Sequence, residues 1–143
     1  MVINVREAGG GGVSVQAENI DLTTERTCTY NEGYKKLKEV EFVDLGDTVG
    51  SISVKAKWWA KNTGGVGFDT FVYKNGSKIS SFYRTTSTSY VRFSYTSSST
   101  FSVGDKWQLY GKQWTDGKIG YVRDVFVMKW MDKVDGTFWN LVD

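Results

Sequence analysis

The sequence predicts an all-β fold, an antiparallel β-sandwich of about eight strands with a flexible N-terminal arm. Apolar and polar residues alternate with a period of two through most of the chain, which is typical of half-buried strands. Turn signals such as Asn75-Gly76 separate these segments at the spacing of a sandwich or barrel. No window of helical length shows a clean 3.6-residue stripe. The chain has 16 glycines and no proline, so we expect turns that need an unusual backbone conformation to use glycine.

The 143 residues fit one domain, which we divide into a flexible arm at 1–12 and a single sandwich at 13–143. In the arm, Val2, Ile3 and Val5 are short and apolar, and residues 9–12 are four glycines. We expect the three apolar residues to form an assembly arm that pairs with a neighbouring sheet edge. Disorder, or docking on the same sandwich, is the alternative for this segment.

The first strands of the sandwich are predicted at 28–30 and 37–45, separated by a polar turn at 31–33. Residues 51–60 form the clearest strand, in which Trp59 points outward with the lysines. The residues expected on its inner face are Ile52, Val54, Ala56, Trp58 and Ala60.

A hairpin follows, because the Asn75-Gly76 pair between strands 68–74 and 77–83 suits a type I′ turn. Strands at 90–95, 106–114 and 120–130 come next, with turns at Gly104-Asp105 and Asp116-Gly117. Simple alternation in the last strand puts Val122, Phe126, Met128 and Trp130 on one face, and Tyr121, Arg123, Val125, Val127 and Lys129 on the other.

The composition excludes several kinds of chemistry. Without histidine there is no Ser-His-Asp or Cys-His catalysis, and one cysteine forms neither an internal disulfide nor a thiolate zinc site. We therefore predict no enzyme, no catalytic residue, no metal site and no cofactor. Cys28 is expected in the core, Glu39 and Glu41 on an outward face, and Asp105 and Asp116 in turns.

The charges are nearly balanced but unevenly distributed. A net charge of +2 predicts neither nucleic-acid nor membrane binding, and the N-terminus has no apolar signal core. Residues 51–104 nevertheless carry seven basic groups and only Asp69 as an acid. This asymmetry reflects either head-to-tail contact between copies of the chain or a chance distribution of charges over the surface. Twelve of residues 85–102 are Ser or Thr, which indicates a solvated strand with its loops or a hydroxyl-rich face for sugars or another subunit.

Six tryptophans, eight tyrosines and eight phenylalanines make the aromatics the main functional signal. Trp58, Trp107 and Trp130 fit inner faces, whereas three other tryptophans do not. Exposed rings bind protein partners at low entropic cost, and a sugar stacks its C–H face on the same rings. The predicted ligand or partner contacts are Trp59, Tyr110, Lys112, Trp114 and Trp139.

An ordered series of motifs covers about residues 50–130: FVYKNGSKI at 71–79, YVRFSY at 90–95, FSVGDKWQLY at 101–110 and VRDVFV at 122–127. The series resembles the jelly-roll β-sandwich modules of tailed-phage structural proteins, in capsid decorations, fibres and tail tips. Similar series occur in carbohydrate-binding modules.

The phage resemblance implies a jelly-roll-like, non-enzymatic virion protein, made in the host cytoplasm, that binds a capsid or tail lattice. It also implies self-association as a homo-oligomer, with a trimer as the expected form. The alternative is a carbohydrate-binding, receptor-binding module that recognises a cell-surface glycan.

Overall fold

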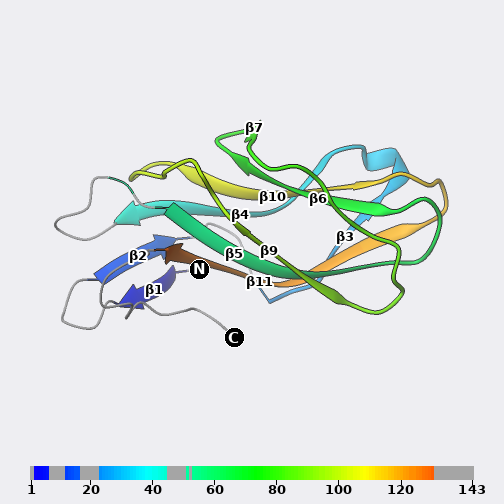
Figure 1. Cartoon of the computed structure of the whole chain (residues 1–143), viewed down its shortest axis with the longest axis horizontal. Coiled ribbons are helices and arrows are strands. Elements are labelled where there is room, and N and C mark those ends of the chain that lie inside the picture. The colour runs from blue at the N-terminus through cyan, green and yellow to red at the C-terminus, as the bar shows by residue number, and fades with distance from the viewer. Residues whose placement is uncertain (1, 7–11, 17–22, 45–50, 52, 131–143) are drawn as a thin grey trace.

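The computed structural model describes residues 2–6, 12–16, 23–44, 51 and 53–130, which form two antiparallel sheets packed as a sandwich (Figure 1). The large sheet contains β1 (Val2–Arg6), β2 (Gly12–Gln16), β4 (Lys35–Asp44), β6 (Phe68–Lys74), β7 (Ser77–Lys78), β8 (Tyr83–Thr85) and β10 (Lys106–Gln113). The small sheet contains β3 (Arg26–Thr29), β5 (Ser53–Asn62), β9 (Val91–Thr96) and β11 (Ile119–Trp130).

The strand order is that of a jelly roll, as expected from the sequence. The large sheet includes the order β4-β10-β6-β8, and the small sheet has the order β3-β11-β5-β9. From β3 to β11 successive strands of these two sets therefore alternate between the sheets, except that β6 and β8 lie in the same sheet, and they interleave as two Greek keys. The eight strands of this sandwich confirm the predicted all-β fold. The additional strands β1, β2 and β7 extend the large sheet at its margins.

The segment predicted as an arm contributes a strand to the large sheet. β1 pairs with β2 in antiparallel register, from Val2 opposite Gln16 to Arg6 opposite Gly12, and β2 pairs with β4. The expected boundary at residue 12 thus coincides with the first residue of β2. Residues 7–11 lie outside the described part of the chain, so the flexibility of the arm stays a prediction, as does its pairing with a neighbouring molecule.

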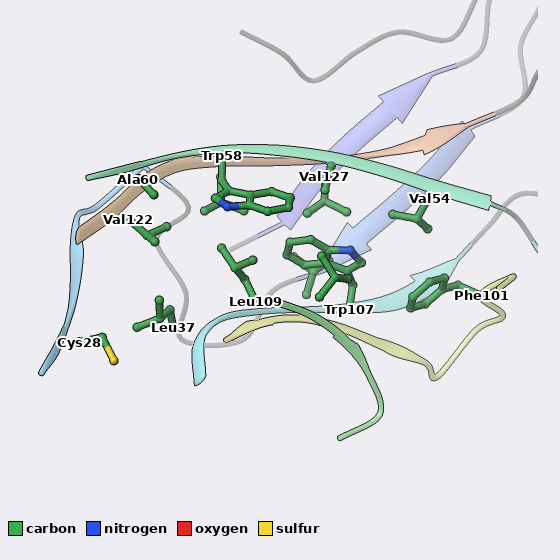
Figure 2. Packing of buried hydrophobic residues seen from close by; sticks show 14 of the residues in the cluster. Cys28, Leu37, Val54, Trp58, Ala60, Phe101, Trp107, Leu109, Val122 and Val127 are labelled. Atoms are coloured by element: carbon green, nitrogen blue, oxygen red, sulfur yellow. The ribbon is translucent and has the colours of Figure 1, made fainter. Parts of the chain in front are cut away.

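Aromatic and aliphatic side chains from both sheets fill the core (Figure 2). On β5, residues from Val54 to Ala60 alternate between buried and half-buried, which confirms the predicted inner face over the described part of that strand. Trp58 and Trp107 are fully buried, with ring centroids 6.5 Å apart. The Trp58 indole donates a 2.9 Å hydrogen bond to Thr70 Oγ1 on β6, so the bond ties one sheet to the other.

The predicted hairpin forms, but its second strand is shorter than expected. Asn75 and Gly76 have φ of 50° and 83°, as a type I′ turn requires. β7 has only two residues because the chain bends away after Lys78. Ser80 Oγ accepts a 2.8 Å hydrogen bond from the Val72 amide, in place of a backbone partner. The predicted strand at 77–83 is therefore two pieces, and β8 resumes the pairing with β6.

The predicted faces of the last strand are wrong at residues 125–127, and the side chains of residues 128–130 lie outside the described part of the chain. The register of β11 against β5 shifts between Arg123 and Phe126, and Asp124 has a φ of 53°. This β-bulge reverses the alternation, so Val125 and Val127 enter the core. Phe126 instead lies on the outer face, where its ring contacts Trp59 at 6.2 Å between centroids.

The described helical structure is limited to one 3-10 turn, η1 (Tyr30–Glu32), at the predicted polar turn after β3. Glu32 accepts a 2.8 Å hydrogen bond from the Thr29 amide and so closes this turn. Within the residues that the structure describes, no helical segment has the length and hydropathy that a membrane crossing needs.

Candidate functional site: an aromatic face on the large sheet

The structure divides the predicted contact residues between two opposite faces. Tyr110 and Lys112 point outward from β10 in the large sheet, and Trp114 follows directly after this strand. Trp59 lies on the outer face of the small sheet, on the other side of the sandwich. Trp139 lies outside the described residues. Tyr110, Lys112 and Trp114 are thus brought together, and Trp59 is separated from them.

The alternating direction of side chains along β10 orients this group. Trp107, Leu109 and Gly111 are buried on the inner side, which leaves Tyr110 and Lys112 outside. Gly111 is required there, because an added Cβ would lie 2.8 Å from the Phe68 ring. The packing of two sheets against each other therefore fixes the direction in which β10 presents its outer side chains.

Three further aromatics, which were not predicted from the sequence, complete the surface. Tyr73 stacks on Tyr110, with ring centroids 4.0 Å apart and ring planes 23° apart. Phe71 lies directly opposite Tyr110 on β6 and is only 3% exposed, because Tyr34 packs on it with centroids 5.5 Å apart. We call this surface the aromatic face, which consists of Tyr34, Tyr73, Tyr110, Lys112 and Trp114 over the buried Phe71.

A buried carboxylate anchors Trp114. Asp69 is 1% exposed, although it lies on the outer side of β6. Its Oδ2 accepts a 2.7 Å hydrogen bond from Trp114 Nε1, and Arg84 bonds both carboxylate oxygens at 2.7 and 2.9 Å. Hydrogen bonding to Asp69 raises the pKa of Arg84. Because the edge of the indole is held by a charged partner, its 38% exposed ring has a fixed orientation before any ligand arrives.

Lys112 supplies a cation between two rings of this face. Its Nζ lies 5.0 Å from the centroid of Tyr34 and 4.5 Å from that of Trp114. Tyr34 is half exposed, so the ammonium group stands at the border between the rings and solvent. The arrangement offers ring surfaces for stacking beside a donor of hydrogen bonds.

The carboxyl groups with altered acidity are poorly suited to proton donation at neutral pH. Burial disfavours the charged form of Glu39, but hydrogen bonds from Gln108 and Lys36 outweigh it and lower the pKa of this group. Burial likewise opposes ionisation of Asp105, but bonds from the Ser102 amide and the Asn75 side chain lower its pKa. A general acid at neutral pH requires the opposite shift.

Cys28 lies in the core, as predicted, and burial raises the pKa of its thiol. Within the described ranges, no group of three or more cysteine, aspartate or glutamate side chains is placed to hold a metal ion. The aromatic face offers stacking, hydrogen bonding and charge pairing.

Comparison with known proteins adds a likeness of fold. No family model matches the chain, and no curated protein matches its sequence. A similar solved structure is that of the insecticidal delta-endotoxin Cry8Ea1 from Bacillus thuringiensis, with 10% sequence identity and a TM-score of 0.50. The match covers 75% of this chain and 20% of that chain, so this protein corresponds to about a fifth of the toxin. At this identity the likeness concerns the fold alone.

Proposed function

We propose that this protein is a non-enzymatic carbohydrate-binding jelly-roll module that binds a glycan on its aromatic face. We place it in the receptor-binding role of a phage or phage-like virion, with synthesis in the host cytoplasm. The observation that carries the proposal is the anchoring of Trp114, whose indole N–H is bonded to the buried Asp69 carboxylate.

The anchored ring suits a sugar for a thermodynamic reason. A flexible side chain loses conformational entropy when a ligand immobilises it, whereas Trp114 is already held by Asp69 and Arg84. The ring can stack on the C–H face of a pyranose without losing its own hydrogen bond. Lys112 stands beside it as a partner for sugar hydroxyl groups, and Tyr34 lies next to the same ammonium group.

The composition of the face favours a glycan over a protein partner. The buried centre of a protein–protein interface is depleted of charged residues, and of lysine in particular. Here Lys112 stands between Tyr34 and Trp114, and Lys78 Nζ lies 5.0 Å from the Phe71 ring centroid. Covering this face with protein would require these ammonium groups to be desolvated, whereas a hydrated sugar would pair with them.

The test uses two matched Trp→Ala variants on opposite sides of the sandwich. A glycan array identifies the sugar that the whole protein binds, and calorimetry then measures its affinity for the variants. We expect Trp114→Ala to weaken binding by about 30-fold or more, as for a central aromatic contact. Trp59→Ala, on the other sheet, is expected to leave this affinity within about twofold. An array without signal, or equal loss in both variants, would contradict the proposal.

A second candidate function is attachment to a capsid or tail lattice, with self-association. It is supported by the position of β1, which pairs with β2 and has no other strand partner among the described elements. Such an edge can accept a strand from another chain.

Light scattering on the full chain and on a variant lacking residues 1–12 tests this second function. We expect a homo-oligomer, with a trimer as the leading form, that dissociates on the deletion. A full-length chain that stays monomeric at high concentration and does not bind purified lattice would exclude it.

A further inference from the structure

Two lysines stand at opposite ends of the aromatic face. Lys112 points outward from β10, and Lys78 lies on β7 directly opposite Tyr73. Strands β10, β6 and β7 are neighbours in the large sheet, so both lysines share its outer side with the rings (Figure 1). Between the two lysines, Tyr34 packs on the buried Phe71. The face therefore has a cation on each side of a pair of rings.

Each of these lysines contacts a ring and not a carboxylate. Lys112 Nζ lies 4.5 Å from the centroid of Trp114 and 5.0 Å from that of Tyr34. Lys78 Nζ lies 5.0 Å from the centroid of Phe71. Within the described part of the chain, neither ammonium group forms an ion pair with an aspartate or glutamate. Both charges are thus held against aromatic surface at the border with solvent.

Four acids on and around this face are paired with other cations. The pairs are Glu32–Lys35, Glu39–Lys36, Asp69–Arg84 and Asp105–Lys74, with N···O distances of 2.7, 2.9, 2.7 and 3.7 Å. Glu41 lies directly opposite Lys106 on β10, and Asp116 is exposed beyond the end of that strand. Among the described residues, the acids of this side are therefore bonded to cations other than Lys112 and Lys78, or stand apart from them.

An exposed ammonium group gains less from a ring than from a carboxylate. Cation–ring contacts are weak where water reaches them, whereas a hydrogen bond from an ammonium to a carboxylate is short and charge-assisted. Tyr34 and Trp114 are both exposed, so a ligand can reach Lys112 between them. A ligand carboxylate would bind this group without breaking an ion pair of the protein. A neutral sugar would offer only hydroxyl groups in its place.

We propose that the aromatic face binds an acidic glycan, built of uronic or sialic acids, whose carboxylate pairs with Lys112. This inference rests on the glycan binding proposed above and names its substrate class. One sugar stacks on Trp114 beside Lys112, and Lys78, beyond Phe71, takes the carboxylate of a further sugar in a longer chain. Lysine is a compact point charge, so single lysines separated by rings suit a ligand with one charge per sugar.

The distribution of charge on this side of the sandwich disfavours single-stranded nucleic acid as the ligand. Such a ligand follows a continuous positive groove along its phosphates. Here Glu39 and Glu41 stand on the outer side of β4, beside β10, and Asp69 lies directly opposite Lys112. These carboxylates interrupt the positive charge. The face therefore offers separate cations beside rings, which suits a sugar acid better than a phosphate backbone.

The experiment compares an acidic oligosaccharide with its own methyl ester, which keeps the rings and hydroxyl groups but removes the charge. The probes are an oligogalacturonate and a sialyllactose, and calorimetry measures the binding of each to the whole protein. We expect at least one of the two acids to bind about tenfold or more tightly than its ester. Raising NaCl from about 50 mM to about 500 mM should reduce this ratio of affinities by about threefold or more.

Matched variants locate the charge that makes this difference. Lys112→Gln should reduce the ratio of acid to ester affinity by about fivefold or more. Lys36→Gln removes a lysine of the same outer side that is paired with Glu39, and should leave the ratio within about twofold of the wild-type value. Trp114→Ala should weaken the binding of acid and ester alike, because it removes the stacking surface that both share.

The outcomes separate this inference from the function on which it rests. Equal affinity for acid and ester, with loss of both in Trp114→Ala, would overturn the acidic ligand and leave glycan binding in place. If neither these probes nor any neutral glycan binds, both proposals fail. An unchanged ratio in Lys112→Gln would overturn the inference. Tighter binding of a sulfated glycan or of a thymidine oligonucleotide, lost in Lys112→Gln, would assign the face to another ligand and overturn it too.

Discussion

The two outer faces of the sandwich use the same kinds of residue in opposite ways. On the aromatic face, the carboxylate of Asp69 is buried and shared by Arg84 and Trp114, so the ring is fixed and partly open to solvent. On the outer side of the small sheet, Glu25 accepts a hydrogen bond from the Tyr90 hydroxyl, Asp124 pairs with Arg123, and Arg123 lies over the Tyr90 ring. The position of the acid therefore decides whether a face presents rings or charge.

The largest expected effect on stability comes from replacing Asp69, the buried acid beneath the aromatic face. Asp69→Asn should lower the free energy of unfolding by about 2–3 kcal/mol, because it removes the charge from a buried group that accepts bonds from Arg84 and Trp114. Urea unfolding measures the difference. The matched change Asp124→Asn affects a pair that is 39–47% exposed, and should cost less than about 0.5 kcal/mol. Equal costs would remove the distinction between the two faces.

The second prediction concerns the β-bulge of β11, which turns Phe126 to the outer side of the small sheet. Asp124 has a φ of 53°, a region that β-branched residues rarely enter. Asp124→Val should destabilise the fold by about 1–2 kcal/mol in thermal unfolding. Asp124→Gly is the control. The free energy of unfolding of this variant should be equal to that of the wild type or higher by up to about 0.5 kcal/mol. A Val variant as stable as the Gly variant would show that residue 124 does not hold this conformation.

The third prediction compares ring–ring and cation–ring contacts by double-mutant cycles. The stacked pair Tyr73 and Tyr110, each changed to Leu, should show a coupling of about 1 kcal/mol. Lys57 Nζ lies 6.0 Å from the Trp59 centroid, and Lys57→Gln with Trp59→Leu should give a coupling of about 0.5 kcal/mol or less. A larger coupling for Lys57 and Trp59 than for Tyr73 and Tyr110 would contradict this ranking.

The smallest effect is a pH dependence on the outer side of the large sheet. The pKa of Glu39 is lowered in the fold, so its ionised form contributes stability above the unfolded pKa of about 4.3 and loses it as the pH falls through the folded value. Glu39→Gln should therefore cost less than about 1 kcal/mol at pH 7, and this cost should fall toward zero as the pH drops through the folded pKa. Urea unfolding from pH 7 into the acid range measures it, and a cost that persists in acid would assign the effect to packing.

Much of the fold could be predicted because each signal was local. The inner face of β5 followed from alternation, and the Asn75-Gly76 turn followed from the need for positive φ. The bulge was not predicted because the alternation of apolar and polar residues does not reveal an extra residue in a strand. Asp124 resembles any outward-facing acid of a strand. Ser80 likewise ended β7 by offering its hydroxyl to Val72, a contact that the sequence does not reveal.

The candidate site was only half predictable for a different reason. Tyr110, Lys112 and Trp114 lie close together in sequence, so one strand was enough to group them. Phe71 and Tyr73 join them only through the pairing of β6 with β10, and the sequence does not state which strands are neighbours. Asp69 was invisible as an anchor for the same reason, since its partners come from two other segments.

The lone cysteine gives the molecule an internal reporter of opening. Cys28 is fully buried on β3, at the edge of the small sheet, and its raised thiol pKa keeps it protonated at neutral pH. Thiol reagents attack the thiolate, so labelling must wait until β3 separates from β11. The labelling rate therefore measures how often β3 separates from β11. Because the sequence has one cysteine, the signal comes from one place and needs no engineered probe.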